Sequence, residues 1–153
     1  MPQACQAYVK ALTQSINMQT YFTMAIPTSI IVIGCGSPEL IRQYKANTQC
    51  PFPIFADPTR SIFKHLGMGI TLDMLGKKRP EYMKEINFTK WQNGQLKEIF
   101  STKGRKKFRG GHLLQVGGEF LFQDGEVHWC HRMRNMRGHA EVDVIRRVLQ
   151  IER

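Results

Sequence analysis

The chain has 153 residues, of which 42% are hydrophobic and 22% are charged. These proportions are typical of one globular domain with its own core, and no run of about eighteen apolar residues provides a membrane span. The stretch before Ile30 contains one lysine and lacks the hydrophobic segment of a signal peptide. We therefore expect a cytoplasmic protein of one domain, residues 1–153.

The net charge of +10 is concentrated in one part of the chain. Between Lys77 and Arg109, eleven Lys or Arg residues stand against three Glu residues, an excess of eight positive charges. Such a run favours either the binding of nucleic acid, an anionic membrane or another acidic partner, or a solvated loop. Because no nucleic-acid-binding pattern accompanies it, we interpret residues 68–110 as a basic, irregular insertion and expect no nucleic acid partner.

The first half of the chain predicts alternating helices and strands. Residues 4–22 predict an amphipathic helix, because apolar side chains recur at spacings of three and four: Cys5, Tyr8, Val9, Leu12 and Ile16. The run SIIVIGCG (29–36) is continuously apolar and predicts a strand covered on both faces. Helix-start signals then open residues 37–47 and 57–67, with a short predicted strand, FPIFAD (52–57), between them.

The second half is irregular at first and then becomes regular again. Residues 68–110 suggest only short helices, around 80–86 and 94–100. In residues 117–133, two β-rich runs flank Asp124-Gly125, which is a strong hairpin signal. Residues 140–151 show the apolar stripe of a final helix. Together the elements predict an α/β fold of thioredoxin-like type, a mixed sheet sandwiched by helices, in which the usual N-terminal strand is missing.

Four cysteines, none in C-x-x-C spacing, are expected to be reduced thiols. Cys35 lies between two glycines after a buried strand, at the sheet edge where open α/β folds hold their sites. It either faces Cys5 across that edge or is packed. Cys50, next to a proline, is predicted in a surface loop, and Cys130 in the core of the hairpin.

The segment HWCHRMRNMRGH (128–139) concentrates histidine and arginine. Because guanidinium groups suit carboxylates and phosphates, His131 and Arg132 are candidates for binding a small-molecule substrate. The alternative is a hydrogen-bonded turn that leads into the last helix. His128 and Cys130 alternate onto one strand face, but no second pair of metal-ligand spacing accompanies them. We expect no metal and no cofactor.

Four segments together resemble a known family: ACQAYVKAL (4–12), VIGCGSPELIRQYK (32–45), FPIFADPTRSIFKHLGM (52–68) and GGEFLFQDGEVHWCHRMRNMRGHAEV (117–142). They are similar to the AhpC/TSA antioxidant-enzyme proteins, a peroxiredoxin-like group with a thioredoxin fold. The resemblance implies a thiol-based oxidoreductase. It also implies that Cys5 is the second cysteine of the family's C-x-x-C-Q-x-Y-V segment, whose first cysteine falls at Pro2 here. Cys5 is then the candidate catalytic residue, without its usual dithiol partner.

Two functions follow from these features. The first is thiol chemistry at Cys5 on a small-molecule, thiol or disulfide substrate, with Cys35 at the same sheet edge. The second is a non-redox protein that binds or transforms a small molecule with Arg132 and His131. A missing strand also leaves an unpaired sheet edge, which a homodimer would cover.

Overall fold

The computed structural model describes residues 3–74, 76–84, 86–87, 89, 93, 111–112 and 114–151. In chain order its elements are α1 (Gln3–Ser15), α2 (Met18–Phe22), β1 (Val32–Gly34), the 3-10 helix η1 (Pro38–Leu40), α3 (Ile41–Thr48), β2 (Ile54–Ala56), α4 (Ser61–His65), the 3-10 helix η2 (Glu81–Met83), β3 (Gly118–Gln123), β4 (Glu126–Arg132) and α6 (Val142–Val148). The helix expected at 94–100, and most of the basic insertion, lie outside the described residues.

Residues 4–22, predicted as one helix, form two helices instead. Helix α1 ends at Ser15, and α2 begins at Met18. The side chain of Asn17, the N-cap of α2, accepts a hydrogen bond of 2.9 Å from the backbone N–H of Thr20. Asparagine competes with helical hydrogen bonding in this way and is a favoured N-cap, so α2 begins anew. The predicted apolar stripe is confirmed, since Tyr8, Val9, Leu12 and Ile16 are all buried.

The strands form two separate pairs. β1 and β2 are parallel, with Val32 opposite Ile54, and β3 and β4 form an antiparallel hairpin. Asp124 and Gly125 both have positive φ, at 51° and 85°, as a two-residue hairpin turn of type I′ requires, so the predicted hairpin is confirmed. Among the described residues no ladder joins the two pairs. The structure is a mixed α/β fold consistent with a thioredoxin-like domain whose sheet is divided in two.

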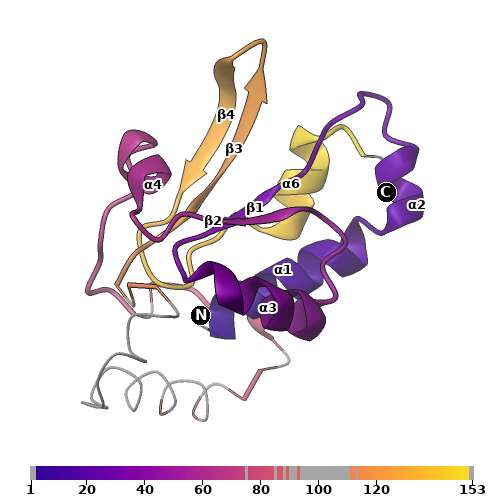
Figure 1. The fold of residues 1–153 in the computed structure, drawn as a ribbon. Coiled ribbons are helices and arrows are strands. Elements are labelled where there is room, and N and C mark those ends of the chain that lie inside the picture. The colour runs from indigo at the N-terminus through magenta and orange to yellow at the C-terminus, as the bar shows by residue number, and fades with distance from the viewer. Residues whose placement is uncertain are drawn as a thin grey trace.

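Helices cover the strands and enclose the core. Figure 1 shows α1 and α3 lying together on one side of β1 and β2, while the hairpin projects away from them. The main buried cluster joins residues of α1, α3, α6 and the segment before β2. None of the helices in the described part of the chain has the length and hydrophobicity that crossing a bilayer demands.

The predicted position of Cys50 was wrong. Its side chain is 1% exposed and belongs to the main core, next to Phe52. The reason lies one residue earlier, where Gln49 ends α3 in a left-handed conformation with φ of 54°. That turn directs the chain inward toward β2, so the loop thiol packs in the core and faces away from solvent.

Candidate functional site

Cys5 lies in the first turn of α1, and its side chain is half-buried. The helix is anchored there, because the Tyr44 hydroxyl of α3 donates a hydrogen bond of 3.3 Å to the Cys5 carbonyl oxygen. The preceding residue, Ala4, is fully buried. Backbone N–H groups at the start of a helix favour a nearby anion, and Cys5 lies next to these groups.

His139, in the loop between β4 and α6, comes to the Cys5 side chain from the far end of the chain. Its Nδ1 lies 2.6 Å from Oε1 of Glu119 on β3. The other carboxylate oxygen, Oε2, accepts a hydrogen bond of 3.1 Å from the Ala140 backbone N–H. Both side chains are largely buried, at 11% and 14% exposure. Glu119 therefore fixes one edge of the imidazole ring.

Interaction with Cys5 and Glu119 changes how His139 titrates. Burial lowers the pKa of His139, but hydrogen bonding and charge interactions with Cys5 and Glu119 outweigh burial and raise it to about 9. The structure thus brings together a thiol, an imidazole and a carboxylate from α1, the 133–141 loop and β3.

Sequence analysis did not assign roles to His139 or Glu119. His139 counted only as one of several histidines in a basic segment, and Glu119 was read as part of a strand. Glu119 stands 20 residues before His139, and only the return of the hairpin places them together. A carboxylate at the start of an otherwise apolar strand, GEFLF, is the one signal that points to a buried acidic group.

Cys35 lies close to the same thiol. Burial raises the pKa of Cys35, and the charge of Cys5 adds to the increase, whereas hydrogen bonding to the His112 backbone opposes it. The two sulfurs therefore lie within electrostatic reach of each other. Cys35 is partly buried, and both thiols are free in this structure.

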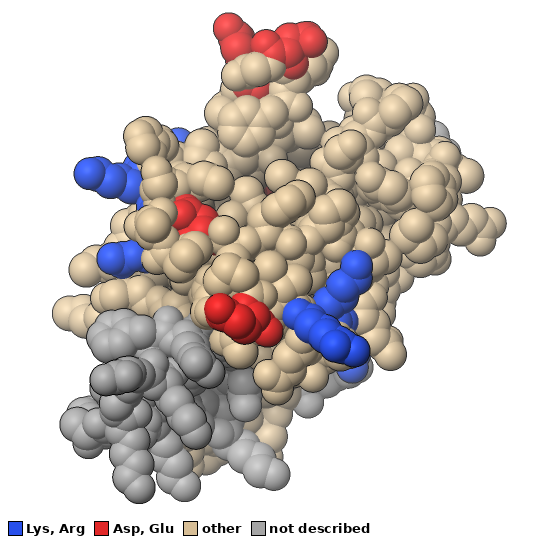
Figure 2. All heavy atoms as spheres, viewed as in Figure 1, with Lys and Arg blue, Asp and Glu red and all other residues tan. Residues whose placement is uncertain are grey.

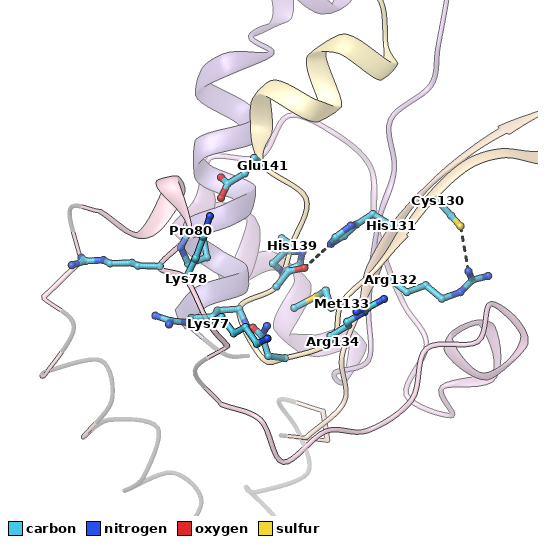
Figure 3. A pocket seen from close by; sticks show the side chains of 14 residues that line it. Lys77, Lys78, Pro80, Cys130, His131, Arg132, Met133, Arg134, His139 and Glu141 are labelled. Atoms are coloured by element: carbon cyan, nitrogen blue, oxygen red, sulfur yellow. Dashed lines mark hydrogen bonds between the residues drawn. The ribbon is translucent and has the colours of Figure 1, made fainter.

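His131 and Arg132 line a cavity of about 780 Å³ between the end of β4 and the segment at residues 77–80 (Figure 3). Their polar groups are already bonded within the protein. Nε2 of His131 lies 2.7 Å from the Gly138 carbonyl oxygen. Arg132 donates through Nε to the Leu66 carbonyl at 2.7 Å and through Nη1 to the Cys130 sulfur at 3.2 Å. Figure 3 shows the Arg132 side chain directed toward Cys130. His131 and Arg132 therefore contribute to the shape of the cavity wall, while the hydrogen-bonding groups named above are occupied within the protein.

The rest of the cavity wall is strongly basic. Its other charged side chains are Lys77, Lys78, Arg79, Arg134, Arg137 and a single carboxylate, Glu141. Arg79 is committed to backbone carbonyls of η2 and the residues after it. Burial lowers the pKa of Arg137, and the neighbouring charge of Arg79 lowers it further. A cavity that holds like charges this close favours an anionic ligand.

The described residues contain no cluster of three or more His, Cys, Asp or Glu side chains that would hold a metal ion. The Cys5, His139 and Glu119 side chains are of the types that serve in acid–base and nucleophilic chemistry. A thiol, a proton acceptor and a carboxylate that orients the acceptor are the parts of an activated nucleophile.

Comparison with known proteins identifies the family of this chain. The family model for AhpC/TSA antioxidant enzymes matches residues 18–135, about three quarters of the chain. The chain belongs to the AhpC/TSA antioxidant-enzyme family. The resemblance drawn from the sequence is thereby confirmed. Cys35, His131 and Arg132 lie inside the matched segment, whereas Cys5 and His139 lie outside it.

Curated relatives extend the similarity across these flanks. The chain is 29% identical over 143 residues to "Peroxiredoxin-like 2C" of Takifugu rubripes, which covers 92% of this chain and 61% of that protein. It is 24% identical over 150 residues to "Peroxiredoxin-like 2C" of Homo sapiens, covering 97% of this chain and 63% of that protein. The chain thus spans about three fifths of the length of these AhpC/TSA relatives. No solved structure matches it.

Proposed function

We propose that this chain is a thiol-dependent redox protein in which Cys5 is the reacting residue and a hydroperoxide or disulfide is the substrate. One observation supports the proposal above others: the Cys5 thiol, in the first turn of α1, interacts with a histidine that a buried carboxylate holds in place. Membership of a family described as antioxidant enzymes points the same way.

A single reactive cysteine can carry out the oxidative half of a redox cycle, in which the substrate is reduced and the cysteine is oxidised. A thiolate attacks the substrate and becomes a sulfenic acid or a mixed disulfide, which a second thiol then reduces. Cys35 is a neighbouring protein thiol that can serve as this second group, and a small-molecule thiol from solution is the other source. A chemistry that depends on free thiols suits a reducing compartment, and we propose the cytoplasm.

Replacement of the thiol by a hydroxyl tests the proposal. Cys5→Ser should reduce hydroperoxide consumption, measured with dithiothreitol as reductant, by at least about a hundredfold, because a serine hydroxyl does not ionise at neutral pH. Cys50→Ala is the matched control, since the Cys50 thiol is buried in the core and donates to the Phe52 carbonyl oxygen. Equal consumption by wild type and Cys5→Ser would contradict the proposal, as would an equal loss in the control.

We infer a second candidate function, the binding of an anionic small molecule in the basic cavity. Within the described part of the chain, the side chains of Lys77, Lys78 and Arg134 make no hydrogen bond or ion pair, so they are available to a ligand. The concave shape suits a compact ligand with two or more carboxylates or phosphates better than it suits a flat duplex surface. His131 and Arg132 form part of the wall.

Calorimetric titration with citrate and with pyrophosphate tests this second candidate. The triple change Lys77→Gln, Lys78→Gln and Arg134→Gln should weaken binding by at least about tenfold, because charge-assisted contacts are lost. Removal of three cations elsewhere, Lys10→Gln, Lys45→Gln and Lys64→Gln, is the control for net charge. Similar weakening in both triple variants would show only general attraction to a basic protein, which would exclude a site in the cavity.

A further inference from the structure

The imidazole of His139 is held so that only one of its nitrogens is committed. Nδ1 lies 2.6 Å from Oε1 of Glu119, and the second oxygen of that carboxylate is occupied by the Ala140 N–H. Nε2 is buried and makes no hydrogen bond of ordinary geometry. A buried ring nitrogen without such a bond is unusual, because an unpaired polar atom away from water destabilises the fold.

Aromatic neighbours fix the plane of this ring. The imidazole stacks on Tyr8 with ring centroids 4.1 Å apart and an angle of 4° between the planes. Tyr82 packs edge-on from η2 at 6.0 Å, and its hydroxyl donates a hydrogen bond of 2.5 Å to the Arg137 carbonyl in the same loop. Tyr8 follows Cys5 by three residues in α1, so both side chains lie on one face of the helix. The ring is therefore parallel to a side chain one turn from the thiol.

We propose that Glu119, His139 and Cys5 form a proton relay, in which Glu119 orients His139 and Nε2 of His139 accepts the proton of the Cys5 thiol. A carboxylate that accepts from Nδ1–H leaves Nε2 of the neutral ring as an acceptor. Cys5 interacts with this ring and lies one turn before Tyr8, the side chain on which the ring stacks. Cys5 is then the catalytic residue, and His139 and Glu119 are the groups that activate it. The inference rests on the proposed function of Cys5.

The groups around the ring favour its protonated form. Burial alone would lower the pKa of His139, but the interactions with Cys5 and Glu119 raise it to about 9, so at neutral pH the ring retains the proton that it takes from the thiol. Burial raises the pKa of both tyrosines, and nearby acidic groups add to it, so both phenols stay neutral. The titratable groups that face the ring are, from each element around it, Cys5 and Tyr8 on α1, Tyr82 on η2, Glu119 on β3 and Glu141 before α6.

The relay accounts for every proton in the reaction with a hydroperoxide. His139 takes the thiol proton, and the Cys5 thiolate attacks the distal oxygen of the peroxide. The S–O bond forms as the O–O bond breaks, so the sulfur is oxidised to a sulfenic acid and the peroxide is reduced to an alcohol or water. The proton held on Nε2 passes to the leaving oxygen, and the ring returns to its neutral form.

Alkylation of Cys5 by iodoacetamide, followed by peptide mass spectrometry across a pH series, tests the relay without any turnover. Glu119→Gln keeps the size of the carboxylate and removes its charge, and His139→Gln removes the ring. In either variant the alkylation rate of Cys5 near pH 6.5 should fall by about tenfold and recover as pH rises toward the range of a free thiol. His65→Gln, an exposed histidine on α4, is the control and should match wild type.

The outcomes separate this inference from the proposed function. If folded Glu119→Gln and His139→Gln both keep the wild-type rate and pH profile, the relay is overturned even where Cys5→Ser abolishes turnover. A second outcome is that Cys5 is alkylated rapidly, its alkylation rate depends on both Glu119 and His139, and Cys5→Ser leaves peroxide consumption unchanged. In that case the relay is supported and the proposed function is contradicted. Should the loss of the ring unfold the chain, the isosteric Glu119→Gln still decides, because a shift in pH profile is not produced by a merely structural role.

Discussion

Gly111 shows how closely the backbone approaches the second thiol of the site. Its φ is +91°, and a Cβ built there would lie 2.6 Å from the Cys35 sulfur and 2.9 Å from the Cys35 carbonyl oxygen. A side chain would have to displace both atoms. The glycine therefore allows the loop before β3 to pack against the end of β1, where Cys35 lies.

Gly111→Ala should destabilise the protein by about 3 kcal/mol, because it combines backbone strain at positive φ with a steric overlap. Gly125→Ala is the matched control, since Gly125 has a similar φ of +85° but open space around its Cβ, and it should cost only about 1 kcal/mol. Urea denaturation of both variants measures the difference. Equal losses would show that the contact with Cys35 relaxes without cost.

At the scale of single residues, the sequence identified the thiols Cys5 and Cys35 but not the side chains that interact with Cys5. Cys5 and Cys35 stand out because cysteine is rare and each lies at the end of a predicted element. Glu119 and His139 become a pair only through the strand register and the loop after β4. No local pattern encodes that proximity, so single-sequence reasoning had no means to find it.

At the scale of elements, local signals predicted where helices and strands occur better than where they end. Asp57-Pro58 predicted the start of a helix, and α4 begins at Ser61 because the Asp57 carboxylate accepts a hydrogen bond of 2.8 Å from the Ile62 N–H. The hairpin at Asp124-Gly125 was predicted to the residue, since its turn chemistry is local. The run at 29–36 yielded a strand of only three residues, 32–34, because strand length depends on a partner elsewhere in the chain.

At the scale of the whole molecule, the sheet is divided into two strand pairs, and large apolar side chains are exposed at the β1–β2 pair. Ile31, 53% exposed, directly precedes β1, and Phe55, 56% exposed, lies on β2 opposite Ile33. Figure 2 shows charged side chains at the tip of the hairpin, at the left edge and in the lower middle of the face in view, with uncharged surface between them. An apolar face at the β1–β2 pair is more typical of an interface than of a solvated surface.

We predict that a second copy of the chain covers this face, so that light scattering at high protein concentration gives twice the mass of the 17.7 kDa chain. Ile31→Lys with Phe55→Lys should restore the monomer mass, because two buried cations at an apolar contact are costly. Leu72→Lys is the control: Leu72 is 82% exposed and lies outside every strand, so its replacement should leave the dimer intact. A monomer mass for the wild-type chain at all concentrations would contradict the prediction. Dissociation by Leu72→Lys as well would place the contact on the surface near Leu72, away from the β1–β2 pair.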